Sequence, residues 1–217
     1  EEVAGIVIEV VQGEGGYVPA PPEFIREIRR ICDQHGIMMI IDEVQSGMGR
    51  TGKMFALDHH AGVKADIVCM AKGIGSGMPI GVCTAKADIM DWHKGAHAST
   101  FGGNPLAMAA GIATITTMRA KDMAGKSMTR GVYFRKRMNE LKALHPSIKD
   151  IRGKGLMIGV EFEPAVGFLT ALGLEKGILL NIIKDHVLRL VPPLTISIRE
   201  IDQAVEILDL MLKEKGL

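Results

Sequence analysis

The chain has 217 residues, of which 47% are hydrophobic and 24% are charged, and these are ordinary values for a globular protein. Its 26 Lys and Arg residues against 25 Asp and Glu residues leave a net charge of +1, so no overall field favours nucleic acid or an anionic membrane. No apolar run approaches the ~18 residues that span a bilayer, and no secretory signal pattern is present. The composition excludes disordered, collagen-like and coiled-coil chains, and we expect a cytoplasmic enzyme that binds neither nucleic acid nor a membrane.

The sequence starts at Glu1, without methionine, and enters an apolar run at once. We therefore expect a fragment of a longer protein. Its three cysteines, Cys32, Cys69 and Cys83, match no C-x-x-C metal or redox spacing, and each is expected to be a small buried apolar residue. His93 and His97 stand four residues apart but have no third ligand at a helpful spacing, so we predict no metal site.

The first half of the sequence alternates strand-like and helical patterns. The run Val3–Val11 is apolar and rich in β-branched residues, which predicts a strand covered on both faces. A helix with one apolar face follows and ends at Gly36, a typical C-cap residue. Two short apolar strands, Ile37–Ile41 and Ile67–Met70, come next. Strand–helix–strand order with apolar strands predicts a parallel sheet in an α/β domain.

The second half has a different character. Pro105–Met118 is apolar nearly all round and predicts a buried helix, and Lys126–Leu144 predicts an amphipathic one. The stretch Ile148–Glu161 predicts strands with a bend, and Leu188–Val191 predicts another strand. The last helix is expected to begin at the capping box Ser197–Glu200. We place a domain boundary near residue 119, with a large domain over 1–119 and a small domain over 120–217.

Two charged residues follow apolar strands in the first half, Asp42 after one and Lys72 after the other. Ligands of open parallel sheets bind at the carboxyl ends of the strands. A lysine that can form a Schiff base and an acid that can keep a pyridine nitrogen protonated are what pyridoxal phosphate requires. Each residue also has an ordinary explanation, because Asp42 alone could be a turn or cap acid and Lys72 alone a surface lysine.

The surrounding motifs resemble those of the class III aminotransferases, which have the pyridoxal-phosphate fold type I. The matching segments stand in the family's order and cover nearly the whole chain; they are IEVVQGEGGY (8–17), DEVQSGMGRTG (42–52), AKGIGSGMPIG (71–81), STFGGNP (99–105), RGKGLMIGVEF (152–162) and RLVPPLTIS (189–197). The resemblance implies an α/β fold: the later part of the large parallel-sheet domain, followed by a C-terminal α+β small domain.

The resemblance also implies a role for each matching residue. Lys72 is similar to the lysine that bonds to pyridoxal 5'-phosphate and moves the proton, and Asp42 to the partner of the pyridine nitrogen. Val44 is similar to the residue that packs on the ring, and Gln45 to the one that hydrogen-bonds the ring oxygen. Thr100 resembles the threonine that reaches the cofactor phosphate of the neighbouring subunit, which implies a homodimer with shared active sites.

Glu14 and Arg189 resemble a pair that forms a salt bridge in members acting on ω-amino acids. The implied reaction is transfer of the ω-amino group of 4-aminobutyrate, ornithine or acetylornithine to 2-oxoglutarate. A racemase or aminomutase on the same fold remains an alternative, as does an inactive fragment that acts only in dimerisation. By the same resemblance, the main cofactor-phosphate loop and the arginine for the α-carboxylate belong to a region before Glu1.

Overall fold

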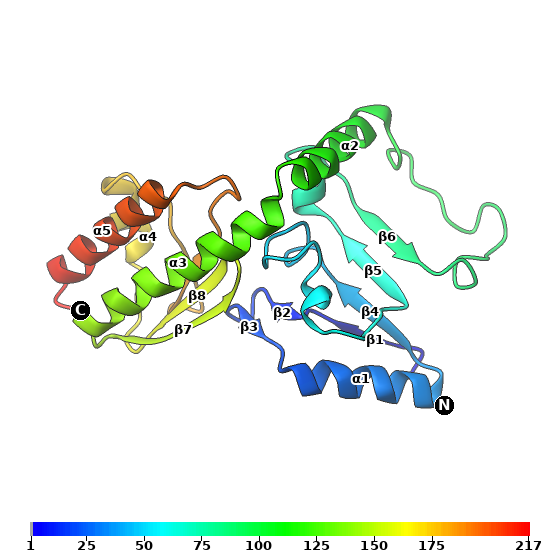
Figure 1. The fold of residues 1–217 in the computed structure, drawn as a ribbon, viewed down its shortest axis with the longest axis horizontal. Coiled ribbons are helices and arrows are strands. Elements are labelled where there is room, and N and C mark those ends of the chain that lie inside the picture. Colours follow the sequence, from blue (N-terminus) through cyan, green and yellow to red (C-terminus); the bar gives the residue numbers. More distant parts are fainter. Residues whose placement is uncertain (1) are drawn as a thin grey trace.

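A computed structural model describes residues 2–217, and the first half of the chain forms a four-stranded sheet (Figure 1). In spatial order its strands are β1 (Gly5–Ile8), β4 (Met38–Asp42), β5 (Ile67–Met70) and β6 (Val82–Ala85). The strands β1, β4 and β5 are parallel, as the sequence predicts, whereas β6 is antiparallel to β5. Because β4 and β5 are parallel neighbours, their carboxyl ends meet at one edge of the sheet.

The apolar run at the start of the chain does not form one long strand. β1 ends at Ile8, and the chain then turns into a small hairpin of β2 (Val11–Gln12) and β3 (Val18–Pro19). The prediction of one strand over Val3–Val11 is therefore wrong in length. It is also wrong in burial, because Val7 is 68% exposed.

The first helix, α1 (Pro22–His35), ends as the sequence predicts. Gly36 has a φ of 66° and donates its backbone N–H to the carbonyl of Cys32, which is the arrangement that favours glycine at a helix end. Ile25 and Cys32 are buried on the inner face of the helix. A single turn of 3₁₀ helix, η1 (Ala56–His59), lies between β4 and β5.

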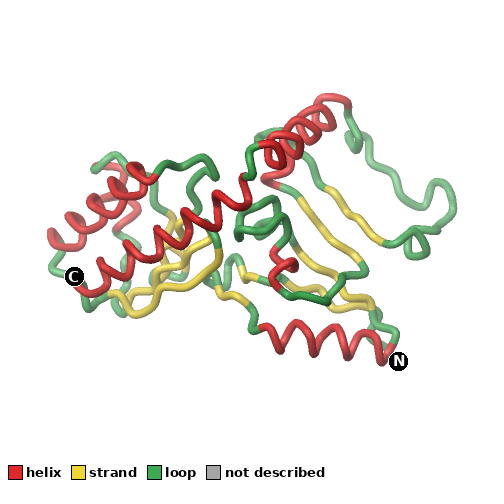
Figure 2. The backbone as a smooth tube through the Cα atoms, in the orientation of Figure 1, coloured by secondary structure: helices red, strands yellow, loops and turns green. Residues whose placement is uncertain are grey.

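The apolar helix α2 (Pro105–Ala120) begins at Asn104, whose Oδ1 accepts the N–H of Ala107 at 2.9 Å. It follows a long loop that leaves β6 (Figure 2). The predicted burial of this helix is wrong for the described residues, because Leu106 is 73% exposed and Ile112 is 68% exposed. Packing inside residues 2–217 therefore covers only one part of this helix, which includes Ala107 and Met118.

The second half forms a separate antiparallel sheet covered by helices (Figure 1). In spatial order its strands are β7 (Ile148–Lys154), β8 (Met157–Phe162), β10 (Val187–Leu190) and β9 (Asn181–Ile183). Its helices are α3 (Met123–Leu144), α4 (Leu169–Glu175) and α5 (Ile198–Glu214). The predicted capping box is present, since Ser197 Oγ accepts the N–H of Glu200 at 3.2 Å and Glu200 Oε2 accepts that of Ser197 at 2.7 Å.

The two halves touch at the β7–β8 turn. Gly155 has a φ of 52°, and a Cβ atom added there would lie 2.4 Å from the carbonyl carbon of Thr51. The N–H of Leu156 donates to the carbonyl of Arg50 at 3.0 Å across the same contact. α2 ends and α3 begins close to residue 119, but whether the two halves are independent domains stays a prediction. No helix of residues 2–217 is long and apolar enough to cross a membrane.

Candidate active site

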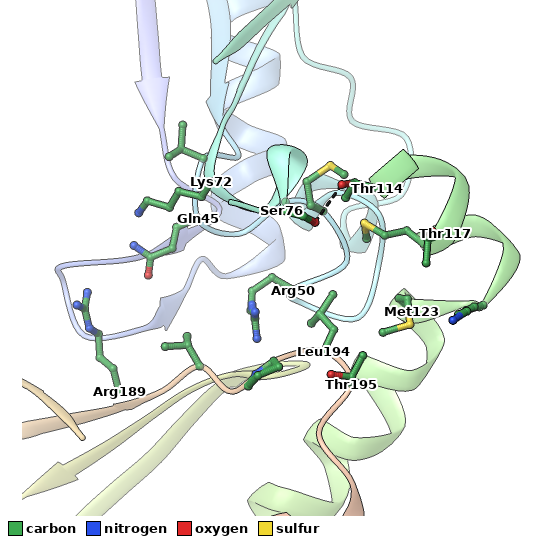
Figure 3. Close-up of a pocket in the computed structure, with 18 of the residues that line it drawn as sticks. Gln45, Arg50, Lys72, Ser76, Thr114, Thr117, Met123, Arg189, Leu194 and Thr195 are labelled. Carbon is green, nitrogen blue, oxygen red and sulfur yellow. Dashed lines mark hydrogen bonds between the residues drawn. The ribbon is translucent and has the colours of Figure 1, made fainter. Parts of the chain in front are cut away.

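A cavity of about 790 Å³ opens where the carboxyl ends of β4 and β5 face the second sheet (Figure 3). Residues of both halves line it. Five of the residues singled out from the sequence are among them: Glu14, Val44, Gln45, Lys72 and Arg189. The fold therefore brings together residues up to 175 positions apart in the chain.

Lys72 is the first residue of a 3₁₀ turn, η2 (Lys72–Gly75), which follows β5 after a single linking residue. Its φ of 46° lies in the left-handed region, which costs free energy in a residue with a side chain. The turn is closed by the N–H of Ile74, which donates to the carbonyl of Ala71 at 3.2 Å. Figure 3 shows the amine of Lys72 extending in the same direction as the side chain of Gln45.

Asp42 is the last residue of β4 and lies opposite Cys69 of β5 in the sheet. Its Oδ1 accepts the backbone N–H of Val44 at 2.9 Å, so it does take part in the local turn. Asp42 itself does not line the cavity, whereas Val44 and Gln45 do. This hydrogen bond thus fixes the start of the segment that carries both cavity residues.

Gln45 leaves one polar atom without a partner. Its Oε1 is buried and accepts no hydrogen bond from residues 2–217. A buried polar atom without a partner carries a free-energy cost, which a bound polar group can remove. An orphaned amide oxygen and a lysine on the same cavity fit a cofactor that carries both a carbonyl carbon and polar ring substituents.

Arg189 of β10 forms the opposite wall of the cavity. Its Nη1 pairs with the carboxylate of Glu14, and its Nε donates to Asn181 Oδ1 at 2.5 Å. The guanidinium also lies 5.6 Å from the centre of the Tyr17 ring. The side chain of Arg189 is 16% exposed and that of Glu14 is 78% exposed. The arginine is therefore held on several sides, whereas the side chain of the glutamate bonds only to the arginine among residues 2–217.

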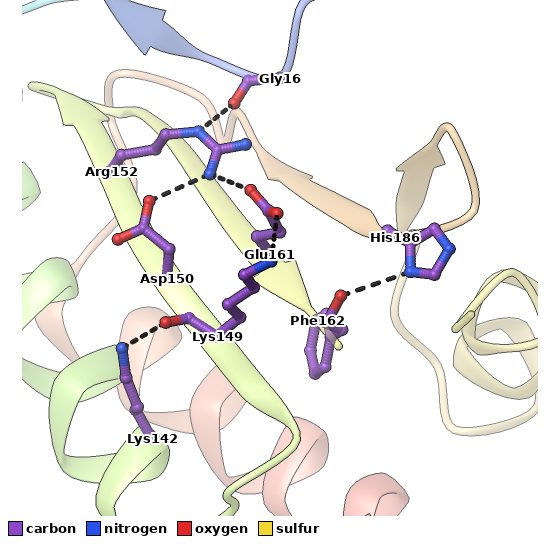
Figure 4. A network of polar contacts seen from close by, with 8 residues as sticks. All are labelled: Gly16, Lys142, Lys149, Asp150, Arg152, Glu161, Phe162 and His186. Atoms are coloured by element: carbon purple, nitrogen blue, oxygen red, sulfur yellow. Dashed lines mark hydrogen bonds and ion pairs between the residues drawn. The ribbon is translucent and has the colours of Figure 1, made fainter. Parts of the chain in front are cut away.

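The turn that carries Glu14 is fastened to the second sheet by Arg152 (Figure 4). Arg152 Nε donates to the carbonyl of Gly16 at 2.8 Å. Its Nη1 pairs with Asp150 at 3.0 Å and with Glu161 at 2.5 Å. These contacts set the distance between the Glu14 turn and β10, where Arg189 lies.

Thr100 is not brought to the cavity. It lies in the exposed loop between β6 and α2, and no residue of that loop lines the cavity. The same loop holds His93 and His97, and the ring of His97 stacks on Trp92 at 6.4 Å between centroids. Residues 2–217 contain no group of three His, Cys, Asp or Glu side chains that could hold a metal ion.

Arg50 and Tyr17 also line the cavity, and neither was singled out as a site residue from the sequence. Arg50 Nη1 donates to the carbonyls of Leu156 at 3.2 Å and Pro192 at 2.6 Å, and burial lowers the pKa of its guanidinium. Tyr17 is buried beneath Arg189, and this burial raises the pKa of its phenol although Arg189 lowers it. Tyr17 has a φ of 59°, and no sequence pattern signals a positive φ in a tyrosine. Arg50 stands inside the GMGRTG motif, and this motif is the sequence pattern from which it could have been predicted as a site residue.

The chain was compared with known proteins. It is 46% identical to an acetylornithine aminotransferase of Caldanaerobacter subterraneus over 215 residues, which are 99% of this chain and 54% of that protein. It is 42% identical to ornithine aminotransferase 2 of Staphylococcus aureus over 209 residues, which are 95% of this chain and 52% of that protein. The chain thus spans about half the length of these curated relatives.

Solved structures agree with the sequence comparisons. An acetylornithine aminotransferase from Elizabethkingia anophelis superimposes with a TM-score of 0.92 at 31% identity, covering 97% of this chain and 54% of the other. An ornithine aminotransferase from Toxoplasma gondii gives a TM-score of 0.92 at 33% identity, covering 99% and 53%. The predicted fold, the later part of a fold type I aminotransferase, is confirmed.

The family model described as "Aminotransferase class-III" matches residues 1–212. This match covers both sheets and every residue that lines the cavity. The chain therefore belongs to the class III aminotransferase family.

Proposed function

We propose that the protein is a pyridoxal-phosphate-dependent aminotransferase that moves the ω-amino group of acetylornithine or ornithine to 2-oxoglutarate. The observation that carries this proposal is a single cavity that places Lys72 opposite the Glu14–Arg189 ion pair. The relatives named acetylornithine and ornithine aminotransferase support the donor class over the 4-aminobutyrate that the sequence left open. A cytoplasmic location stays a prediction.

The residues of this chain would divide the work as follows. When bound, pyridoxal phosphate supplies the electron sink that makes a proton on the substrate carbon removable. Lys72 would hold the cofactor at its carbonyl carbon and would carry the proton from one substrate atom to another. Asp42 would keep the ring nitrogen protonated, Val44 would pack against the ring face, and Gln45 would donate its amide N–H to the ring oxygen.

The Glu14–Arg189 pair gives a physical basis for using two different substrates in one site. An ω-amino donor approaches Lys72 with a chain end that carries no carboxylate, whereas 2-oxoglutarate carries two carboxylates. When Glu14 is paired with Arg189, the charge of the arginine is neutralised. When Glu14 moves away, the guanidinium of Arg189 can bind a substrate carboxylate through two hydrogen bonds. The high exposure of Glu14 and the fixed position of Arg189 suit a glutamate that moves and an arginine that stays.

The assignment of Lys72 can be tested by borohydride reduction in the presence of pyridoxal phosphate, followed by peptide mapping. We expect the label on Lys72, because it follows β5 directly and faces the cavity. Lys121 is the matched control, since it also lines the cavity but caps the end of α2. Lys72→Ala should lose the label and all transamination, whereas Lys121→Ala should keep both. A label on Lys121, or spread equally over several lysines, contradicts the assignment.

The role of the ion pair can be tested in single turnovers of the whole enzyme. Glu14→Ala should slow the half-reaction with the ω-amino donor more than the half-reaction with glutamate, because Arg189 is left uncovered. Arg189→Ala should do the reverse and weaken glutamate and 2-oxoglutarate most. Glu175→Ala and Arg199→Ala are matched controls on exposed positions away from the cavity. Equal losses in both half-reactions for both cavity variants argue against gating.

Two other readings of the chain predict different results. A racemase or aminomutase on this fold would yield no keto product, so product analysis separates it from a transaminase. A chain that acts only in dimerisation would bind no cofactor, and the visible absorbance that pyridoxal phosphate acquires on bonding to a lysine would be absent. The names of the relatives favour the transaminase.

We propose further that the enzyme is a homodimer, with Thr100 acting in the partner's site. Large apolar side chains are exposed along α2 and the loop before it: Trp92 at 51%, Phe101 at 82%, Leu106 at 73% and Ile112 at 68%. An exposed apolar patch of this kind favours a protein contact. Thr100 lies inside this surface and away from the cavity of its own chain. Sedimentation of the whole enzyme would measure the oligomeric state.

A further inference from the structure

Arg50 joins the two halves of the molecule through both its backbone and its side chain. Its carbonyl oxygen accepts the hydroxyl of Ser127 in α3 at 2.9 Å and the N–H of Leu156 at 3.0 Å. Its guanidinium donates to the carbonyl of Leu156 at 3.2 Å and to that of Pro192 at 2.6 Å. One residue of the first half thus bonds to α3, to the β7–β8 turn and to the segment after β10.

The two segments that this bridge connects carry opposite walls of the cavity. On one side, Arg50 and Gln45 belong to one run of turns after β4, in which the N–H of Arg50 donates to the carbonyl of Gly47 at 3.2 Å. On the other side, Pro192 follows β10, the strand that carries Arg189. Figure 3 shows the side chain of Arg50 pointing from the first segment towards the second. The distance between the two walls therefore depends on the reach of the Arg50 side chain.

The run of turns after β4 also packs on the turn that carries Lys72. Met48 lies in this run and is buried in one hydrophobic cluster with Ile74 of η2. A Cβ atom added at Gly73 would lie 3.4 Å from the Cβ of Met48, so the two turns are in direct contact. A shift of this run relative to β10 would therefore change the distance between Lys72 and Arg189.

The bridge depends on the length and shape of an arginine side chain. Both bonds come from Nη1, at the far end of the side chain. The guanidinium is planar and its N–H groups point in fixed directions, whereas the lysine ammonium is a compact charge that ends one covalent bond earlier. Arg50→Lys would therefore keep the charge, but it must either lose the carbonyl of Pro192 or draw the segment after β10 closer.

We propose that Arg50 is a positioning residue that sets the distance between Lys72 and Arg189, and with it the length of the dicarboxylic 2-oxo acid that the enzyme accepts. This inference rests on the proposed function, in which the substrate reacts at Lys72 while its far carboxylate binds Arg189. A fixed distance between these side chains fits one number of methylene groups between the keto carbon and the far carboxylate. One methylene more or fewer in an enzyme pocket changes kcat/KM by about 10–200-fold.

The test compares 2-oxoglutarate with its homologues one methylene shorter and longer, oxaloacetate and 2-oxoadipate, in the whole enzyme loaded with cofactor. The ratio of their kcat/KM values is measured within one preparation, so a lower fraction of folded enzyme does not change it. We expect the unaltered enzyme to favour 2-oxoglutarate by about tenfold or more. In Arg50→Lys and Arg50→Met this preference should fall below about threefold, because the bridge to Pro192 no longer fixes the distance. If Arg50→Met does not fold, Arg50→Lys decides.

Ser127→Ala is the matched control at the same junction. Ser127 is fully buried and bonds to the backbone carbonyl of Arg50, but it does not line the cavity. Its replacement leaves the side chain of Arg50 unaltered, so it should lower the stability of the enzyme and keep the preference for 2-oxoglutarate. An equal loss of preference in Ser127→Ala would overturn the proposal, because the junction as a whole would then set the distance.

Binding of succinate, glutarate and adipate, measured by calorimetry on the same whole enzymes, gives the comparison without turnover. The unaltered enzyme should bind glutarate most tightly, and Arg50→Lys should bind the three acids nearly equally. An Arg50→Lys enzyme that keeps the order, or an unaltered enzyme that shows no order, would overturn the proposal. The proposed function fails separately, if the unaltered enzyme forms no glutamate from 2-oxoglutarate, and the binding order then still decides the role of Arg50.

Discussion

The two sheets of this protein differ in how completely the chain covers them. The second sheet and its helices enclose a large buried core drawn from α3, α4, α5 and all strands but β9. The first sheet has smaller clusters, one against α1 and one beneath η2. Val7 of β1 and Ile112 of α2 are each 68% exposed in this half. The half that carries Lys72 and Asp42 is therefore the half whose apolar surface is least covered.

This contrast has a physical interpretation. Burying apolar surface is the main favourable term in folding, and each large apolar side chain left in water gives up ~1.5–3 kcal/mol of it. The chain spans about half the length of its curated relatives, and large apolar side chains of α2 are exposed within residues 2–217. Within residues 2–217, the second sheet therefore gains more of this free energy from its core than the first sheet does.

The largest expected effect on stability lies in the second half. Leu208 of α5 is fully buried in its core, so Leu208→Ala removes the transfer free energy of the side chain and leaves a cavity. Such a change costs about 3–5 kcal/mol. Urea unfolding of the chain should show the corresponding fall in midpoint.

The matched change in the first half is Ile112→Ala on the exposed side of α2. We expect the free energy of unfolding of the chain to change by less than about 0.5 kcal/mol, because little apolar surface is lost and alanine favours the helix. A large loss for Ile112→Ala would mean that a second copy or another surface covers α2 in solution, and sedimentation would show it. A small loss of stability for Leu208→Ala would contradict the conclusion that the second half has the larger buried core.

Asp42→Asn should lower the reaction rate without lowering the stability of the first half. The asparagine Oδ1 can still accept the N–H of Val44, so the fold of the turn should survive. The amide cannot hold the ring nitrogen protonated, and losing such a charged contact costs roughly a hundredfold or more in rate, about 3 kcal/mol. Turnover of the whole enzyme and unfolding of the variant measure the two effects, with Asp88→Asn as an exposed control. Normal turnover in Asp42→Asn would show that another group protonates the ring.

Much of the fold could be predicted because local patterns and packing agree. Gly36 ends α1, β5 runs over Ile67–Met70 as expected, and Ser197 caps α5. The predictions are wrong where contacts between distant segments determine the structure and the local sequence does not. Periodicity could not show that the chain turns after Ile8, nor that α2 would lack a covering surface. Cys83 was expected to be buried and is exposed within residues 2–217, because its sequence neighbours do not reveal that β6 is the last strand of the sheet in this part of the chain.

The candidate site was predictable only in part, for a related reason. Lys72 and Asp42 could be found because they follow apolar strands, and Glu14 and Arg189 because their motifs resemble a family. Arg152 is a different case, since its hydrogen bond to Gly16 joins β7 to the turn between β2 and β3, and no local pattern contains both residues. Contacts across 136 positions of sequence are visible only in the folded chain.

An effect smaller than those of Leu208→Ala and Asp42→Asn comes from a charged cluster that fastens α1 to the first sheet. Asp66 is 8% exposed and lies between Arg29 at 2.7 Å and Lys86 at 2.8 Å, and its Oδ2 also accepts the N–H of Met39 at 2.8 Å. Burial alone raises the pKa of Asp66, but these hydrogen bonds and charges outweigh it and lower the pKa from 3.8 to about 2.

Because its folded pKa is lowered, Asp66 binds fewer protons in the folded chain than in the unfolded one. Its contribution to stability is therefore complete above pH 3.8, falls as the pH is lowered, and is lost below about 2. The difference in pKa corresponds to about 2 kcal/mol at neutral pH. Asp66→Asn should thus be less stable than the unaltered chain at pH 7, and the two should converge towards pH 2 in urea unfolding. Asp88→Asn, at an exposed position, should follow the unaltered chain at every pH. A constant gap between Asp66→Asn and the unaltered chain down to pH 2 would mean that Asp66 acts through packing, and that charge does not hold α1 to this sheet.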